Sequence, residues 1–229
     1  RRNMHLKCTL CNTRLDASEQ KYPTLIDAYM DLLRRRPEGG HVRVAQYVIG
    51  NMYVQGGAQR QDQQEAMRWW MRSAEAEFRN AQFNIGIAYR DGLGVKQSFK
   101  KARAWFDKAA AQGHKGAPSA IGDMYDNGQG VLQNEREAAA WFKEAASRGN
   151  TNAQYIIAKM YRDGRGVPVD IVESLKWFKR SIKGGSGDAA TTLGVMYEEG
   201  HVVEEDLAKS RILFEIGAKL GQTHAMYNL

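Results

Sequence analysis

Apolar residues recur along the chain at the spacing of amphipathic helices, and the whole pattern repeats every 36 residues. In each period an alanine is followed four residues later by an aliphatic residue and eight residues later by a tyrosine, which places all three on one helical face. The marker residues are Ala45, Ala81, Ala117, Ala153, Ala189 and Ala225, together with Tyr53, Tyr89, Tyr125, Tyr161 and Tyr197. A fixed period of about 20 to 50 residues is typical of a repeat solenoid.

The first helix of each period, helix A, contains a small residue and ends at a glycine. The small residues are Gly50, Gly86, Gly122, Ala158 and Gly194. Their recurrence predicts that a neighbouring helix packs against the backbone there, and the alanine at 158 indicates that size is the constraint. The terminal glycines, Gly56, Gly92, Gly128, Gly164 and Gly200, stand where a left-handed residue ends a helix. The following G-x-G-V text is interpreted as a structural turn, because a phosphate-binding loop follows a strand.

The second helix, helix B, opens at a column of good N-cap residues: Asp62, Ser98, Asn134, Asp170 and Asp206. Glu65, Glu137 and Glu173 stand three residues further on and predict capping boxes. Two aromatic columns follow, Trp69/Trp105/Trp141/Trp177/Leu213 and Trp70/Phe106/Phe142/Phe178/Phe214. Their spacing forms one apolar stripe, so we interpret them as core between repeats and not as a ligand site.

The N-terminal residues stand outside the repeats. Residues 1–22 are expected to be irregular, and they contain the only cysteines, Cys8 and Cys11. This C-x-x-C fits a passive or disulfide-linked tail, half of a metal site or a redox pair, and the sequence leaves these alternatives open. Residues 23–44 are predicted to contain a capping helix over about residues 24–36 that covers the open face of the first repeat. The repeats are assigned to residues 45–229.

Charge and composition exclude several function classes. The formal net charge is +7, but residues 1–44 carry +4 of it, with nine basic against five acidic residues. The repeats are therefore nearly balanced, and no lysine-rich groove with interleaved aromatics predicts nucleic-acid binding. The sequence contains no run of 18 apolar residues, so no membrane span is predicted. No histidine or serine stands in a catalytic motif, and we predict no enzyme activity and no cofactor.

The repeat closely resembles the Sel-1-like repeat, a relative of the tetratricopeptide repeat. The matching text is A-x-x-x-[LI]-G-x-x-Y, G-x-G-V and A-x-x-W-[FW]-x-x-[SA]-[AI], over five full repeats and the start of a sixth. The first and last full repeats depart at the turn, where they lack the second glycine. The resemblance implies an all-α, right-handed α/α superhelical solenoid of about five 36-residue helix-turn-helix repeats. We expect about ten to twelve helices and no strands. Because Arg1 is an unusual first residue and Leu229 falls within a repeat, we also expect a processed or truncated piece.

The family resemblance implies a scaffold that binds another protein, whose identity the sequence does not give. A bacterial envelope adaptor is the first interpretation, and an immunity protein that inhibits a secreted toxin is the alternative. A thiol-redox or metal-binding role through Cys8 and Cys11 ranks third. The expected compartment is the bacterial periplasm or a secretory compartment, with the cytoplasm as the alternative.

The resemblance also places the partner site, because helix A lines the concave face in tetratricopeptide repeats. Aligning Gly50 with that family's small position predicts a site made of Tyr47, Asn51, Phe83, Ile87, Arg90, Asp123, Asp126, Tyr155, Lys159, Arg162, Glu198 and Glu199. The aromatic members are expected to have no core role, so that truncating Phe83 or Tyr155 would weaken the complex without lowering the melting temperature. Aromatic residues and arginines are the usual anchors of binding energy.

Overall fold

The structure, a computed structural model, describes residues 6–7, 14–15, 25–56, 62–223 and 225. The chain divides into two compact units, Arg1–His114 and Lys115–Leu229. Cys8 and Cys11 lie outside the described residues, so the alternatives for the C-x-x-C remain predictions.

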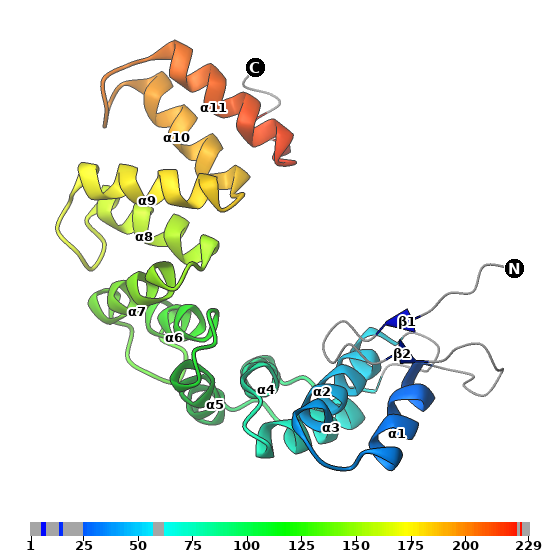
Figure 1. Ribbon diagram of the computed structural model, residues 1–229. Helices are drawn as coiled ribbons and strands as arrows, with labels where there is room; N and C mark the ends of the chain where they lie inside the picture. The colour runs from blue at the N-terminus through cyan, green and yellow to red at the C-terminus, as the bar shows by residue number, and fades with distance from the viewer. Residues whose placement is uncertain (1–5, 8–13, 16–24, 57–61, 224, 226–229) are drawn as a thin grey trace, which may run out of the picture. The chain divides into compact units, whose positions relative to one another are not determined.

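Among the described residues the fold is all-α, with eleven helices that pack in adjacent pairs (Figure 1). The first unit contains α1 (Leu25–Arg35), α2 (Gly40–Gln55), α3 (Gln63–Glu75), α4 (Arg79–Asp91) and α5 (Phe99–Ala111). The second contains α6 (Ala117–Asn127), α7 (Glu135–Ser147), α8 (Thr151–Asp163), α9 (Ile171–Lys183), α10 (Gly187–Glu199) and α11 (Leu207–Lys219). Helices α2, α4, α6, α8 and α10 are the predicted A helices, and α3, α5, α7, α9 and α11 are the B helices.

The expectation of no strands is wrong in one place. Residues Leu6–Lys7 (β1) and Arg14–Leu15 (β2) form a two-stranded antiparallel pair in which Leu6 faces Leu15. Both strands lie in the arm that was predicted to be irregular. Because no 36-residue pattern covers this arm, the periodicity that predicts the helices gives no information about it.

Helix α1 packs against the first repeat, where the capping helix was predicted. Its Ile26 and Tyr29 are buried in one cluster with Ala45, Ile49 and Trp69. The helix lies within one residue of each predicted end.

The predicted N-cap column is confirmed in all five repeats, whereas the capping boxes are wrong. Each N-cap side chain accepts a backbone N–H of its own helix B. The N-cap's own N–H donates to the carbonyl of the tyrosine in the preceding helix A, as from Asp170 to Tyr161 at 2.9 Å. Because that donor is already satisfied, two of the N3 glutamates pair instead with a cation of the next turn, Glu65 with Arg68 and Glu173 with Lys176.

The small residue of helix A is required by the aromatic residue of helix B in the same repeat. A Cβ added at Gly86 would lie 2.5 Å from the Phe106 ring, and one at Gly194 would lie 2.8 Å from Phe214. The φ angles at these helical glycines are not positive, which confirms that size is the constraint. The phenylalanines of this column are at most 1 % exposed.

The tryptophan column is less uniform than predicted. Trp69 and Trp177 are buried, which confirms a core role at these two positions. Trp105 and Trp141 are half-buried. In the fifth repeat the same place is taken by Leu213, which is also half-buried.

The G-x-G-V turn packs against the preceding repeat. The second glycines, Gly94 and Gly166, have φ of 69° each, in the left-handed region that favours glycine. A Cβ at Gly94 would lie 2.4 Å from the Gln63 carbonyl oxygen, and one at Gly166 would lie 2.0 Å from the Glu135 carbonyl oxygen. The turn therefore brings two repeats together, in agreement with a structural role.

Candidate functional site

The candidate site is the set of twelve side chains predicted on the A helices, here called the helix-A face. The opposite side of each A helix carries the buried alanine and isoleucine of the core, such as Ala81 and Ile85. The ten face residues before α10 are half-buried, and Glu198 and Glu199 are exposed. Side chains in such positions can meet a partner and still be ordered by their neighbours.

The aromatic residues of the face pack against the core, so the expectation that they have no core role is wrong. Tyr47 lies edge-on to Phe78, with 5.2 Å between ring centroids. Phe83 lies 5.6 Å from Phe106. Tyr155 lies 6.1 Å from Phe178 and belongs to the rim of the second unit's core cluster. In the second and fourth repeats the aromatic residue three positions before the small residue therefore reaches the helix-B phenylalanine.

Phe83 also stacks on a histidine. The two rings of Phe83 and His114 lie 4.1 Å apart and are inclined by 24°. Burial, with the positive charge of Arg79 as the second cause, lowers the pKa of His114 to about 4. At neutral pH the imidazole is therefore uncharged and extends the apolar surface of Phe83.

In the first unit a pair of asparagines connects two repeats. Asn51 Oδ1 accepts hydrogen bonds from Trp70 Nε1 and from Asn84 Nδ2, each at 3.0 Å. Asn51 and Ile87, both predicted site residues, line one pocket of about 200 Å³ together with Val54 and Leu93. The structure thus brings these two residues together.

Asn84 was missed by the sequence analysis, and so was its counterpart Thr192. Tyr155 Oη and Thr192 Oγ1 lie 3.3 Å apart in the second unit. Both missed residues belong to the column Val48, Asn84, Ala120, Ile156 and Thr192. The signal was a polar residue in an otherwise apolar column, because such a residue on a half-buried face needs a hydrogen-bond partner.

The two predicted anchor arginines are paired with the next residue in the sequence. Arg90 donates to both carboxylate oxygens of Asp91, at 2.7 and 2.9 Å. Arg162 does the same with Asp163, at 2.6 and 3.0 Å. Hydrogen bonding to the arginine lowers the pKa of each aspartate, so both pairs are charged at neutral pH. The pairs fix the two guanidinium groups along the helix ends.

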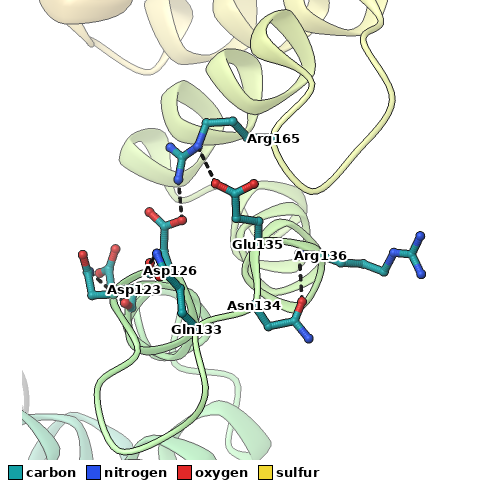
Figure 2. Close-up of polar contacts among 8 residues, drawn as sticks. Asp123, Asp126, Gln133, Asn134, Glu135, Arg136 and Arg165 are labelled. Atoms are coloured by element: carbon teal, nitrogen blue, oxygen red, sulfur yellow. Dashed lines mark hydrogen bonds and ion pairs between the residues drawn. The ribbon is translucent and has the colours of Figure 1, made fainter.

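Asp126 takes part in a contact between repeats that the sequence analysis did not predict (Figure 2). Arg165, in the G-x-G-V turn of the fourth repeat, donates from Nη2 to Asp126 at 2.7 Å and from Nε to Glu135 at 3.0 Å. These two carboxylates raise the pKa of Arg165. Asp126 is therefore a structural residue of the turn as well as a member of the face.

The remaining charged members divide between two helices of the second unit. Lys159 on α8 lies over the Tyr155 ring, 5.4 Å from its centroid. Glu198 and Glu199 end α10 and are exposed. The charge of Glu199 contributes to the raised pKa of Arg162, so the two helix ends lie within electrostatic reach of each other.

No group of three or more His, Cys, Asp or Glu side chains that could bind a metal ion occurs among the described residues. None of the helices in the described ranges is both long and apolar enough to cross a membrane.

Comparison with known proteins agrees with the repeat register. The Sel1 repeat family matches residues 43–78, 79–114, 119–150, 151–186 and 187–222. No curated protein sequence is significantly similar to the chain.

Two solved structures are similar at 28 and 29 % identity. A Sel1 repeat protein from Oxalobacter formigenes has a TM-score of 0.80 at 28 % identity, over 89 % of this chain and 83 % of its own. The antigen c5321, a protective antigen of uropathogenic Escherichia coli with the same repeat fold, has a TM-score of 0.75 at 29 % identity. The match covers 89 % of this chain but only 43 % of that antigen.

Immunity proteins share the fold at lower identity. The immunity protein PA5088 of Pseudomonas aeruginosa has a TM-score of 0.60 at 19 % identity, over 86 % of this chain and 73 % of its own. At this identity the likeness describes the fold alone.

Proposed function

Because the chain belongs to the Sel1 repeat family, we propose that it is a non-catalytic scaffold that binds a partner protein through the helix-A face. We place this scaffold in the bacterial envelope, in the periplasm or a secretory compartment. The bacterial origin of the two relatives at 28 and 29 % identity supports a bacterial setting.

The observation that carries the proposal is that the polar and aromatic side chains of the face are ordered before any partner binds. Asn51 is fixed by two donors, Arg90 and Arg162 by bidentate pairs, and Tyr155 by Thr192. Ordering a long side chain on binding costs about 0.5–1.5 kcal/mol. A face whose side chains are already ordered therefore loses less entropy when it binds.

The charges on the face of the second unit alternate from helix to helix. The basic Lys159 and Arg162 lie on α8, between the acidic residues of α6 (Asp123, Asp126) and those at the end of α10 (Glu198, Glu199). We expect a partner segment to align its charges against this order, because complementary charge mainly sets orientation and association rate.

The test compares two double charge reversals of equal size. Glu198→Lys with Glu199→Lys changes the face, and Glu204→Lys with Glu205→Lys changes two exposed residues beyond the end of α10. The partner is first captured from a bacterial envelope extract on the immobilised parent chain and identified by mass spectrometry. We expect the face variant to bind this partner at least tenfold more weakly and the control variant to bind within twofold of the parent. Equal binding of the partner by the two variants would show that the helix-A face does not bind it.

The identity of the captured protein separates the two roles that the fold permits. Components of an envelope assembly support an adaptor. A single cognate toxin, neutralised by the parent chain, would replace the adaptor role by an immunity role while leaving the face as the binding surface.

A further inference from the structure

A pocket on the helix-B side of the second unit is distinct from the helix-A face. It measures about 330 Å³, and its lining residues belong to α9, α10 and α11. Its apolar lining comes from Ile182, Leu193, Ile212 and Leu213, with Tyr197 beside them. Lys179 and Lys209 complete the lining.

The same place is filled in other repeats by the repeat's own tryptophan. The residues 36 positions before Ile182, Leu193, Tyr197 and Leu213 are, in the same order, Ala146, Ile157, Tyr161 and Trp177. These four residues lie together in the core cluster of the second unit, where Trp177 is only 6 % exposed. In the first unit Trp105 packs in the same way with Ala74, Ile85 and Tyr89. The pocket of the fifth repeat lies where Leu213 replaces an indole and Ile182 replaces an alanine.

The mouth of the pocket is more apolar than the same position in the other repeats. Ile212 is 57 % exposed, and the residues in its column are Arg68, Ala104, Ala140 and Lys176. An exposed isoleucine beside a missing indole adds apolar surface where the other repeats present small or charged side chains. Single exposed apolar residues are ordinary, but apolar surface that continues into a pocket indicates a binding site.

The charge around the pocket is basic. Helix α9 carries four basic residues against one acidic residue, and α11 carries three against one. Lys209 pairs with Asp206 at 2.7 Å and lies over the Tyr197 ring. Lys179 is exposed and makes no ion pair within the part of the chain that the structure describes. The buried tryptophans have cations nearby in the same manner, with Arg180 4.6 Å from the Trp177 ring centroid.

We propose that the pocket formed by Ile182, Leu193, Ile212 and Leu213 binds an aromatic side chain, tryptophan above all, on an acidic segment of a partner protein. The incoming indole takes the place of the tryptophan that the fifth repeat lacks. Lys179, which lines the pocket, attracts the acidic flanks. This second binding surface is independent of the helix-A face, so either proposal can fail alone.

The site would stay open if a further repeat followed. One period after Lys179 and Ile182 stand Glu215 and Ala218, on the same helix as Leu213. A following repeat would face Glu215 and Ala218, as α11 faces Lys179 and Ile182 across the pocket. The pocket itself uses Lys209, Ile212 and Leu213, which face back toward α9.

The probe is the blocked peptide Asp-Glu-Trp-Glu-Asp carrying 5-fluorotryptophan, whose ¹⁹F line broadens and shifts when the indole is bound. Titration with the parent chain is expected to give saturable broadening at micromolar to millimolar peptide. A control peptide with alanine in place of tryptophan is measured by its competition with the labelled peptide, and it is expected to bind at least tenfold more weakly than the labelled peptide. A second control peptide, with lysine in place of the acidic residues, is expected to show the same loss.

Leu213→Trp is the decisive variant, because it restores the residue that the other repeats have. We expect it to reduce peptide binding at least tenfold while the melting temperature stays equal to or above that of the parent. Ile212→Glu changes an exposed residue, so it preserves the fold and tests the mouth independently, with the same expected loss. Lys179→Glu is expected to weaken binding several-fold, and Lys183→Glu, an exposed lysine on the same helix but outside the pocket lining, is the matched control.

Several results would overturn the proposal. One is peptide binding that survives both Leu213→Trp and Ile212→Glu. Another is equal binding of the alanine and tryptophan peptides. Absence of ¹⁹F broadening at millimolar peptide would also overturn it. This holds even if decanoate, tested separately as an apolar anion, binds to the pocket.

Discussion

One aromatic residue per repeat determines how closely the two helices of that repeat approach. Phe106, Phe142, Phe178 and Phe214 are each at most 1 % exposed, and Trp70 takes the same position in the first repeat at 7 %. Apart from Phe178, whose counterpart is Ala158, each ring lies on the backbone of helix A at a glycine without room for a larger side chain. The neighbouring tryptophan column lies nearer the surface, so the two columns differ in what their removal costs.

Replacing the two neighbouring aromatics of α7 should separate these roles. Phe142→Ala is expected to lower the free energy of unfolding by about 3–5 kcal/mol, as large-to-small changes in a packed core do. Trp141→Ala is expected to cost less than about 3 kcal/mol, because Trp141 is half-buried and leaves a smaller cavity. Urea titrations followed by circular dichroism measure both. A larger loss of unfolding free energy for Trp141→Ala than for Phe142→Ala would show that the tryptophan column is the more deeply packed one.

His114 makes stability depend on pH in a predictable direction. Its pKa is about 4 in the native chain, against 6.5 for an ordinary histidine. Between these values the unfolded chain binds a proton that the native chain does not. The free energy of unfolding is therefore unaffected by the titration of His114 above pH 6.5 and decreases progressively as the pH falls toward 4.

The matched variant for this prediction is His114→Phe, which keeps a ring against Phe83 and cannot titrate. Denaturant titrations between pH 4 and 7 should show a shallower loss of stability for the variant than for the parent. The aspartates with lowered pKa, such as Asp91, contribute equally to both chains and cancel in the comparison. Parallel curves for the two chains would contradict the pKa of His114.

At the scale of the element, the start of helix B is fixed from two sides. The N-cap side chain accepts an N–H of its own helix, and the N-cap N–H donates to helix A of the same repeat. The glutamate at N3 of α9, Glu173, forms an exposed ion pair on the helix surface and does not cap the helix. The cap and the turn therefore form one structural unit, to which this glutamate adds little.

Two single substitutions in α9 test this arrangement. Asp170→Ala removes the side chain that caps the Glu173 N–H and should cost about 0.5–2 kcal/mol of unfolding free energy. Glu173→Ala removes only its pair with Lys176, and exposed pairs contribute about 0–1 kcal/mol. The urea midpoint should therefore move clearly for the first variant and little for the second. A glutamate variant as destabilised as the aspartate variant would support a capping box after all.

At the scale of the whole molecule, the array gains stability repeat by repeat. Neighbouring helix pairs of each unit share clusters, such as the one that joins α7, α8, α9 and α10. In repeat proteins each repeat contacts only its neighbours, so stability is a sum of local terms and of interfaces between neighbours. Such an array need not unfold in one step.

Local destabilisation should therefore stay local. Phe106→Ala is expected to speed amide hydrogen exchange in α4 and α5 by more than tenfold while α9 and α10 change by less than threefold. Phe178→Ala is expected to give the reciprocal pattern. Native-state exchange read by mass spectrometry measures both maps. Uniform acceleration over all helices would show a single cooperative unit instead.

Some of the fold and of the candidate site follows directly from the sequence. The positions of the A and B helices, the five N-caps and the left-handed glycines are local features, determined by backbone chemistry within a few residues. The small-residue column is also readable, because a glycine that recurs in a helix against its propensity implies a close approach. The match of Asn51 with Ile87 in one pocket follows from the same register.

The tertiary structure alone decided which side chains meet between repeats. Asn51 with Asn84, Tyr155 with Thr192 and Asp126 with Arg165 are separated by 33, 37 and 39 residues. A period determines which residues share a face, but the offset between neighbouring repeats determines which of them come within hydrogen-bonding distance. That offset results from packing, here from the glycine turn that lies on the preceding helix B. For the same physical reason the sequence shows that Leu213 replaces a tryptophan, and only the packed helices show that the replacement leaves a pocket open.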